Sequence, residues 1–296
     1  MQDIFFQFPK HKVLYNELMK NHTSFKIGGA ADIVFFAENA DDINKCVSLC
    51  KQNSIPYYIV GNGTNILVKD KGFKGVIIKT TNLNQIVKKD VNTFYIGAGV
   101  SLIDLSKYFL KENLTGFEFA CGIPASFGGA VYMNAGAYGP EMKDIIISTE
   151  VLKNGELVTL SNEEMKFSYR KSIVKGTDMV IIGGVVSLSK GDYTSIKEKM
   201  QYLTMQREKK QPLDMPSAGS IFRRPSGYFA GKLIQDSNMT GYTVGGAMVS
   251  KKHSGFIVNT GNSTAKDVLQ LIKKIKEVVK EKFNVELEEE IITVGE

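Results

Sequence analysis

The chain has 296 residues, of which 43% are hydrophobic and 23% charged, and its formal net charge is +6. This composition is typical of a globular protein with a sizeable core and excludes a largely disordered or proline-rich chain. Because both charge signs alternate along most of the sequence, we expect a mixed surface and no nucleic-acid partner. No apolar run approaches the roughly 18 residues of a membrane helix, so we expect no membrane insertion. The start of the chain lacks a basic region followed by an apolar stretch, so we expect no secretory signal.

The predicted elements mix strands and helices along the whole chain. Strands are expected at 31–36, 56–60, 66–68, 75–79, 93–100, 147–152, 179–188, 256–259 and 284–295. Helices are expected at 41–51, 101–113, 194–208 and 264–283. Two of the helices carry capping signatures, Ser101 with Asp104 and Thr264 with Asp267. The pattern predicts three units, of which the second begins near Thr80 and the third opens after the 194–208 helix.

The three cysteines give no sign of a disulfide framework or a metal site. Cys46 and Cys50 lie one helical turn apart, alongside Ile43 and Val47, which predicts one apolar helix face. With no histidine or further cysteine near them, core packing is favoured over metal binding. An odd number of thiols, counting Cys121, fits a reducing cytoplasm.

Glycine clusters are the strongest chemical signal in the sequence. The GNGTN loop at 61–65 follows a predicted strand, where glycine backbone approaches phosphate oxygens without hindrance. It matches neither the dinucleotide fingerprint nor the Walker loop, and taken alone it favours a hairpin or tight turn. The run CGIPASFGGAVYMNAGAYG at 121–139 is rich in small residues, which let backbone press against another backbone or a flat ligand. Together the two loops point to one extended, anionic ligand.

Seven segments, taken in order, closely resemble the UDP-N-acetylenolpyruvoylglucosamine reductase family of flavoenzymes. The resemblance covers nearly the whole chain and is far more specific than any single motif. The segments are NHTSFKIGGAAD, PYYIVGNGTNILV, GFEFACGIPASFGGAVYMNAGAYG, FSYRKS, QREKKQP, AGSIFRRP and LEEEI.

The resemblance implies an α+β fold with a two-part FAD-binding unit of the vanillyl-alcohol-oxidase type, formed by 1–79 and 80–200, and a substrate-binding domain at 201–283. A final strand at 284–296 would return to the first part. FAD would be bound noncovalently. Residues implied to hold its diphosphate are Gly61, Asn62, Gly63, Thr64 and Asn65. Residues implied to line the flavin are Gly122, Ile123, Pro124, Ser126, Gly128, Gly129, Ala130 and Asn134. Ala125 stands where many relatives carry glycine, which is a small departure.

The resemblance also implies the reaction, in which NADPH reduces FAD and the flavin N5 then delivers hydride to the vinyl carbon of UDP-N-acetylglucosamine enolpyruvate. An enolate forms and must be stabilised and protonated. The implied roles are a cation at the carboxylate for Arg170, a polarising acid for Glu290 and a proton donor for Ser220. The positions implied to bind the UDP-sugar are Tyr169, Lys210, Arg223 and Arg224.

From the residues alone, each of these sites also has an ordinary interpretation. Ser220 fits a loop serine, Arg170 a surface cation, and Glu290 a solvated acidic strand edge. Periodicity does not choose between Glu289 and Glu290, and only the LEEEI resemblance favours the latter. His253 is interpreted as a structural or surface histidine.

We therefore expect a cytoplasmic reductase that makes UDP-N-acetylmuramate, with no metal and no required oligomer. No extra tyrosine-bearing segment is visible between Tyr169 and Ser220, which favours the shorter branch of the family. The alternatives are another flavin oxidase of the same fold and a flavin- or nucleotide-binding module without turnover.

Overall fold

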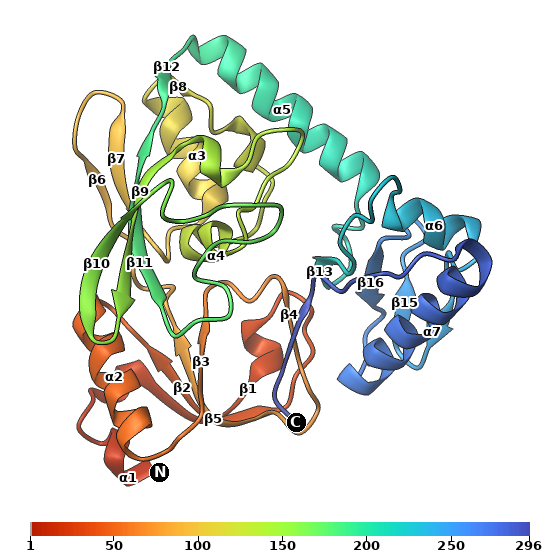
Figure 1. Cartoon of the computed structure of the whole chain (residues 1–296), viewed down its shortest axis with the longest axis horizontal. Coiled ribbons are helices and arrows are strands. Elements are labelled where there is room, and N and C mark those ends of the chain that lie inside the picture. The colour runs from red at the N-terminus through yellow and green to blue at the C-terminus, as the bar shows by residue number, and fades with distance from the viewer. Residues whose placement is uncertain (1) are drawn as a thin grey trace. The chain divides into compact units, whose positions relative to one another are not determined.

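The protein is described by a computed structural model that covers residues 2–296, with side chains from Ile4 onward (Figure 1). Its residues form two compact units. The first unit comprises the chain up to Leu14, Ile33–Asn62 and Val76–Arg207. The second unit comprises Tyr15–Asp32, Gly63–Gly75 and Glu208–Glu296. The three-part division expected from the sequence follows different boundaries and stays a prediction.

Two larger sheets contain most of the strands of the first unit. The sheet with strand order β1-β2-β5-β3 is formed by Val13–Leu18, Ala30–Phe36, Phe73–Lys79 and Tyr57–Val60. The antiparallel sheet β10-β9-β11-β7-β6 is formed by Glu156–Ser161, Ile146–Lys153, Val180–Ser187, Thr93–Gly97 and Ile86–Lys88. A short pair joins β12 (Ser189–Lys190) to β8 (Leu114–Thr115). Strands β3 and β5 run parallel, and the chain passes between the two units within β1, β2 and β5.

The helices predicted at 41–51, 101–113 and 194–208 all begin in the first unit. The α-helices that begin in the first unit are α1 (Gln2–Phe5), α2 (Ala40–Gln52), α3 (Leu102–Lys111), α4 (Phe127–Tyr132) and α5 (Tyr193–Lys210). The apolar face predicted for α2, including Cys46 and Cys50, is buried. Ser101 caps α3 as predicted, by accepting a hydrogen bond from the Asp104 N–H at 3.4 Å. The remaining single turns are 3-10 helices at Lys10–Lys12, Met19–His22, Glu118–Ala120 and Met142–Asp144.

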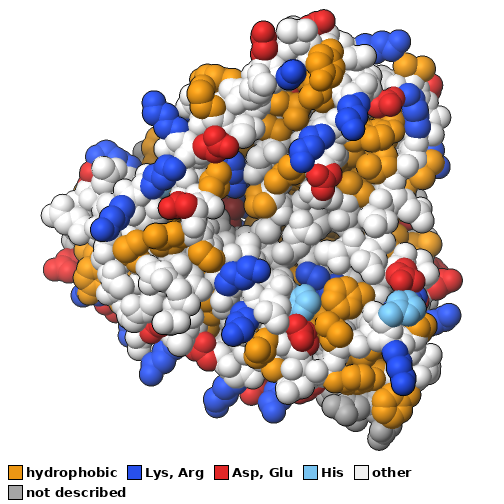
Figure 2. Space-filling model, turned by 180° about the vertical axis from the view of Figure 1, so that it is seen from behind, with side chains coloured by type: hydrophobic (Ala, Val, Ile, Leu, Met, Phe, Trp, Pro, Cys, Tyr) orange, Lys and Arg blue, Asp and Glu red, His pale blue; other side chains and the backbone are white. Residues whose placement is uncertain are grey.

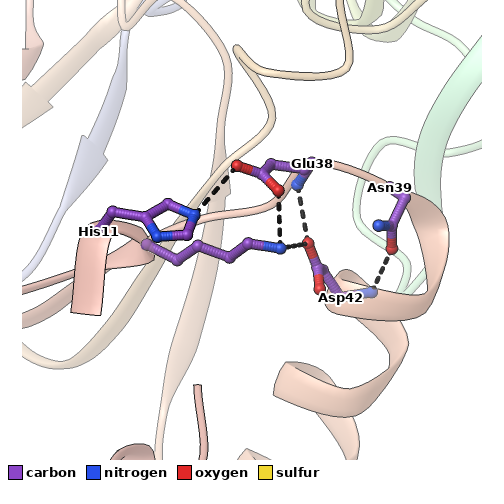
Figure 3. A network of polar contacts seen from close by, with 5 residues as sticks. His11, Glu38, Asn39 and Asp42 are labelled. Carbon is purple, nitrogen blue, oxygen red and sulfur yellow. Dashed lines mark hydrogen bonds and ion pairs between the residues drawn. The ribbon is translucent and has the colours of Figure 1, made fainter. Parts of the chain in front are cut away.

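A polar network secures the start of α2 (Figure 3). The buried Lys12 ammonium lies 2.7 Å from an Asp42 oxygen and 2.8 Å from a Glu38 oxygen. The hydrogen bond to Asp42, more than any other cause, raises the pKa of Lys12. Asp42 also accepts the Glu38 N–H, and the Asn39 side chain accepts the Asp42 N–H. The positive charge of Lys12 is therefore balanced by two carboxylates.

The second unit packs two helices with a small antiparallel sheet. Its sheet order is β13-β16-β15-β14, formed by Ser217–Ser220, Phe256–Asn259, Ala247–Val249 and Thr243–Val244. The helices are α6 (Ala230–Asp236) and α7 (Ala265–Phe283), and a parallel pair joins β17 (Ile292–Val294) to β4 (Ile66–Val68). The core includes Leu67, Ile221, Ile257, Leu271 and Leu287.

Helix α7 confirms its predicted start, where Thr264 and Asp267 form the capping box. Its apolar face points into the core of the second unit. The buried residues on this face include Val268, Leu271, Ile272, Ile275 and Val279, and Val278 and Phe283 pack against the core. A second cap was not predicted: the Asp70 carboxylate accepts the N–H groups of Ala265 and Lys266 at 2.7 and 2.9 Å. Local patterning thus predicts the helix, whereas a residue far away in sequence completes its N-terminus.

The predicted strand at 284–295 is much shorter in the structure. Only Ile292–Val294 forms a regular strand. Before it, the acidic stretch makes irregular backbone pairs, in which the Arg223 N–H donates to Glu288 O at 2.9 Å and the Glu290 N–H donates to Ile221 O at 2.7 Å. Four carboxylates within five residues disfavour regular cross-strand pairing.

Charges of both signs are interspersed on the face shown in Figure 2, as the alternating sequence predicts. Across residues 2–296, no helix has both the length and the apolar character of a membrane span. The described side chains also include no group of three or more histidines, cysteines or acidic residues with the geometry of a metal site.

Candidate active site

The GNGTN loop is a connection between two sheets and is not a hairpin. It links β3, which pairs with β5, to β4, which pairs with β17. Of the two structures favoured by the isolated motif, the hairpin is therefore wrong, because the flanking strands are not paired with each other. The division between the units falls within the loop, between Asn62 and Gly63.

In the first unit, the start of the loop packs against the 122–134 segment. A Cβ added to Gly61 would lie 2.1 Å from Ser126 Oγ, so only glycine fits there without rearrangement. The Asn62 side chain donates a hydrogen bond to Pro124 O at 3.0 Å. The Lys79 ammonium donates a hydrogen bond to Gly61 O. The two segments predicted to hold one ligand thus contact each other.

In the second unit, the end of the loop is fixed by different partners. Gly63 has a φ of +67°, and a Cβ there would lie 2.2 Å from His22 O. The Ser24 N–H donates to Gly63 O at 3.1 Å. The Asn65 side chain donates to the Glu290 carbonyl at 3.1 Å. The hydrogen bonds of this part of the loop thus involve its carbonyls and side chains.

The backbone N–H groups of the loop remain available. Within the described residues, none of the five N–H groups from Gly61 to Asn65 donates a hydrogen bond to a protein acceptor. Consecutive unsatisfied N–H groups in a glycine-containing turn form a concave site for anions. A diphosphate, with oxygens only as acceptors, has the chemistry that such donors require. The loop therefore fits the diphosphate of FAD.

The 122–134 segment forms a turn followed by the short helix α4. The Ser126 hydroxyl caps this helix by accepting the Gly129 N–H at 3.4 Å. The Gly128 N–H donates to Ala98 O at 2.8 Å, which fixes the helix on the end of β7. Asn134 is fully buried; its side chain donates to Glu141 and to Ser168 O and accepts the Lys143 N–H. Asn134 thus organises the segment, and its part in flavin binding stays a prediction.

The predicted catalytic residues fall in both units. Arg170 belongs to the first unit, where its guanidinium lies 4.9 Å from the Tyr169 ring centre and its Nη2 donates to Gly136 O at 3.4 Å. Its φ of +55° is uncommon for a residue with a side chain, and such strain concentrates at functional positions.

Ser220 and Glu290 are brought together in the second unit from distant parts of the sequence. Ser220 ends β13 opposite Phe256, and the Glu290 N–H donates to the carbonyl of the next residue, Ile221. Glu290 is half-buried, whereas Glu289 is exposed and its carboxylate lies 3.0 Å from Lys276 Nζ. The two neighbouring acids therefore have different environments.

The residues predicted to bind substrate are cationic or aromatic side chains with varied exposure. In the second unit, Arg223 lies 3.4 Å from a Glu288 oxygen, and its buried Nε has no hydrogen-bond partner among the described residues. The Arg224 guanidinium stacks 4.0 Å from the Phe229 ring centre. Lys210 is exposed at the end of α5. Tyr169 is exposed in the first unit.

His253 has the structural role predicted for it. Its Nδ1 accepts the Gly255 N–H at 3.1 Å, and its ring packs on Phe256 with centres 5.0 Å apart. Burial lowers its pKa. Lys79 carries no prediction from the sequence, although a lysine that ends the apolar run GVIIK is an unusual signal.

Known proteins that resemble this chain cover nearly all of it. Two family models match: "FAD binding domain" over residues 31–161 and "UDP-N-acetylenolpyruvoylglucosamine reductase, C-terminal domain" over 211–294. The UDP-N-acetylenolpyruvoylglucosamine reductase of Caldanaerobacter subterraneus is 51% identical, covering 96% of this chain and 94% of the relative. That of Clostridium perfringens is 50% identical, with coverages of 94% and 91%.

A crystal structure of the UDP-N-acetylenolpyruvylglucosamine reductase from Thermus caldophilus is also similar. It is 33% identical, with a TM-score of 0.81, and covers 94% of this chain and 97% of that one. The predicted α+β class is confirmed, with an FAD-binding domain followed by the C-terminal domain of the reductase family. The chain belongs to the UDP-N-acetylenolpyruvoylglucosamine reductase family.

Proposed function

We propose that this protein catalyses the FAD-mediated, NADPH-dependent reduction of UDP-N-acetylglucosamine enolpyruvate to UDP-N-acetylmuramate, a step of peptidoglycan precursor synthesis. The observation that carries the proposal is its 51% identity to a relative named for this reductase, over 94% of that relative. The match of residues 31–161 to an FAD-binding domain supports the cofactor.

Bound FAD would supply the hydride, received from NADPH, that reduces the vinyl carbon of the substrate. The diphosphate is assigned to the N–H groups of Gly61, Asn62, Gly63, Thr64 and Asn65, which donate to no described residue. The flavin is assigned to the turn that contacts this loop. Its proposed lining residues are Gly122, Ile123, Pro124, Ser126, Gly128, Gly129, Ala130 and Asn134.

The remaining chemistry is assigned to three side chains. Arg170 would bind the substrate carboxylate, because a guanidinium pairs with both carboxylate oxygens. Glu290 would polarise the enolate that forms at that carboxylate, and Ser220 would donate the proton to the adjacent carbon. The backbone pairing beside Ser220 supports a joint role for the latter two. The half-buried position of Glu290 favours it over Glu289.

Cationic and aromatic side chains are assigned to the UDP-sugar. Arg223 carries an Nε without a partner in the described structure, which suits a diphosphate oxygen as acceptor. Arg224 and Lys210 add positive charge for the same diphosphate, and Tyr169 offers an exposed ring for packing. The buried, unpaired thiols of Cys46, Cys50 and Cys121 support a reducing, cytoplasmic location.

The first test is NADPH absorbance over time with the flavin-loaded protein, in the presence and absence of the enolpyruvyl UDP-sugar. NADPH consumption that depends on this sugar is the expected result. Consumption that needs only oxygen would indicate an oxidase of the same fold. No consumption after addition of FAD would leave a binding module.

The proton donor is tested by the substitution Ser220→Ala. This variant should keep FAD and its reduction by NADPH, while substrate reduction falls by about 10²–10⁴-fold. Ser217→Ala is the matched control, since Ser217 lies on the same strand and its backbone carbonyl, which the substitution keeps, accepts the Ser24 hydroxyl at 2.7 Å. Equal rates for Ser220→Ala and Ser217→Ala would contradict the assignment.

A further inference from the structure

The first unit contains a buried lysine that the proposed reaction does not use. Lys79 is the last residue of β5 and is only 4% exposed. A buried ammonium is costly unless a carboxylate pairs with it. Lys12, the other buried lysine among the described side chains, meets this requirement through Glu38 and Asp42, which Figure 3 shows beside the start of α2.

Lys79 has no such partner within the described chain. Its Nζ donates a hydrogen bond to the carbonyl of Gly61, and no carboxylate contributes to its electrostatic environment. An ammonium has three N–H donors, so one carbonyl leaves most of its capacity unused. Burial alone lowers the pKa of Lys79 to about 8.

The Lys79 ammonium contacts the GNGTN loop at residues 61–65. Gly61 is the first of the five residues whose N–H groups have no acceptor in the described structure. The same glycine packs on Ser126 of the segment assigned to the flavin. A buried positive charge and a row of N–H groups thus lie at one place, and both favour a bound anion.

We propose that Lys79 is the counter-ion of the FAD diphosphate, and that it positions the loop by holding the Gly61 carbonyl. The inference rests on the proposed binding of FAD at residues 61–65 and assigns a further residue to that site. The lysine is a positioning residue, because its contact is with the loop backbone. Its burial in the absence of a carboxylate follows if the matching negative charge is the cofactor.

The neighbouring titratable groups do not compensate for this charge. Strand β2 carries Asp32, strand β3 carries Tyr57 and Tyr58, and helix α4 carries Tyr132. None of them contributes to the lowered pKa of Lys79, which results from burial. The 61–65 loop itself has no titratable side chain.

A bound anion should raise the pKa of Lys79 above its value in the FAD-free protein. FAD binding therefore takes up a proton at pH values above about 8, so the affinity for FAD falls as the pH rises. The Kd for FAD should be nearly constant up to pH 7 and increase about tenfold between pH 7 and pH 9, provided that the pKa in the complex lies well above 9.

The experiment measures FAD release from the flavin-loaded full chain. The protein is diluted at pH 6.5–9.5, and flavin fluorescence reports the free FAD. The variants are Lys79→Met, Lys79→Arg and the control Lys12→Met, which removes a buried lysine that is already paired. Thermal unfolding of each variant reports its folding separately.

Lys79→Met should weaken FAD binding about 10–100-fold at pH 7 and abolish the increase towards pH 9. Lys79→Arg should bind tightly with a flat profile, since arginine keeps its charge. Lys12→Met should keep the wild-type profile. A flat wild-type profile, or an equal loss at pH 7 and pH 9 in Lys79→Met, would overturn the proposal. Should Lys79→Met fail to fold, the wild-type and Lys79→Arg profiles decide. Wild-type protein that binds no FAD at any pH would instead refute the cofactor site itself.

Discussion

Replacing Gly61 with alanine is expected to create a steric clash between the GNGTN loop and Ser126. The added Cβ would lie 2.1 Å from Ser126 Oγ and 3.3 Å from Ser126 Cβ. The hydroxyl can rotate away, but it then releases the Gly129 N–H that it caps. Loss of an N-cap costs about 1 kcal/mol, and the remaining tight contact adds about 1–2 kcal/mol of overpacking. We therefore expect Gly61→Ala to destabilise the first unit by about 2–3 kcal/mol.

The same contact should weaken FAD binding. Relief of the clash displaces the loop whose N–H groups are assigned to the diphosphate, so the Kd should increase by about 10–100-fold. Denaturant unfolding followed by circular dichroism measures the first effect, and flavin fluorescence after dilution measures the second. Because the chain has two units and a cofactor, each transition is assigned with FAD both present and absent.

A second substitution tests whether the clash is the cause. Ser126→Gly removes both atoms that the new methyl group would meet, at the expense of the α4 cap. In that background, Gly61→Ala should cost less than about 1 kcal/mol. A Gly61→Ala protein as stable as wild type, or a cost that is unchanged beside Ser126→Gly, would refute the reasoning.

Three further predictions concern the second unit. Glu290→Gln should lower the rate of substrate reduction by about 10²–10⁴-fold without affecting flavin reduction by NADPH. Glu289→Gln should lose only its exposed ion pair with Lys276, worth less than about 1 kcal/mol. Stopped-flow absorbance separates the two half-reactions, and a rate loss confined to Glu289→Gln would assign the polarising acid to Glu289 instead. Asp70→Ala should lower the free energy of unfolding by about 2–3 kcal/mol, since two N–H groups of α7 lose their acceptor, and unchanged denaturant unfolding would contradict this. The hydrogen bond from the Thr264 N–H lowers the pKa of Asp267. Asp267 therefore stabilises the folded chain above its unfolded pKa near 4, and this stabilisation is lost as the pH falls through the lower folded pKa. During acid titration, the far-UV circular dichroism signal should therefore decline less steeply in Asp267→Asn than in the wild type.

Local features of the fold were predictable because their signals lie within a few residues. The apolar faces of α2 and α7 repeat every three to four positions, and tertiary packing buries the same faces. The capping residues Ser101 and Thr264 act on N–H groups three positions later. In contrast, Asp70 caps α7 from nearly 200 positions away, so no local pattern predicts it.

The site was predictable only through resemblance to a family. Taken alone, GNGTN favours a hairpin, because composition cannot reveal that its flanking strands join different sheets. Ser220 and Glu290 carry no distinctive local pattern, and only the pairing of the C-terminal stretch with residues 221–223 brings them together. Lys79 was missed for the same reason, since its lack of a carboxylate partner is a property of the folded chain.

The backbone around Asn65 connects the proposed cofactor loop with the proposed acid. The Asn65 side chain donates to the Glu290 carbonyl at 3.1 Å, and the Ile292 N–H donates to Asn65 O at 3.0 Å. Two hydrogen bonds thus fix the Glu290 backbone relative to the end of the GNGTN loop. They add to the hydrogen bond from the Glu290 N–H to Ile221 O on a stretch where regular strand pairing begins only at Ile292. Asn65 therefore has a structural task in addition to its proposed contact with FAD, which explains why a side-chain amide, with a donor for the carbonyl, suits this position.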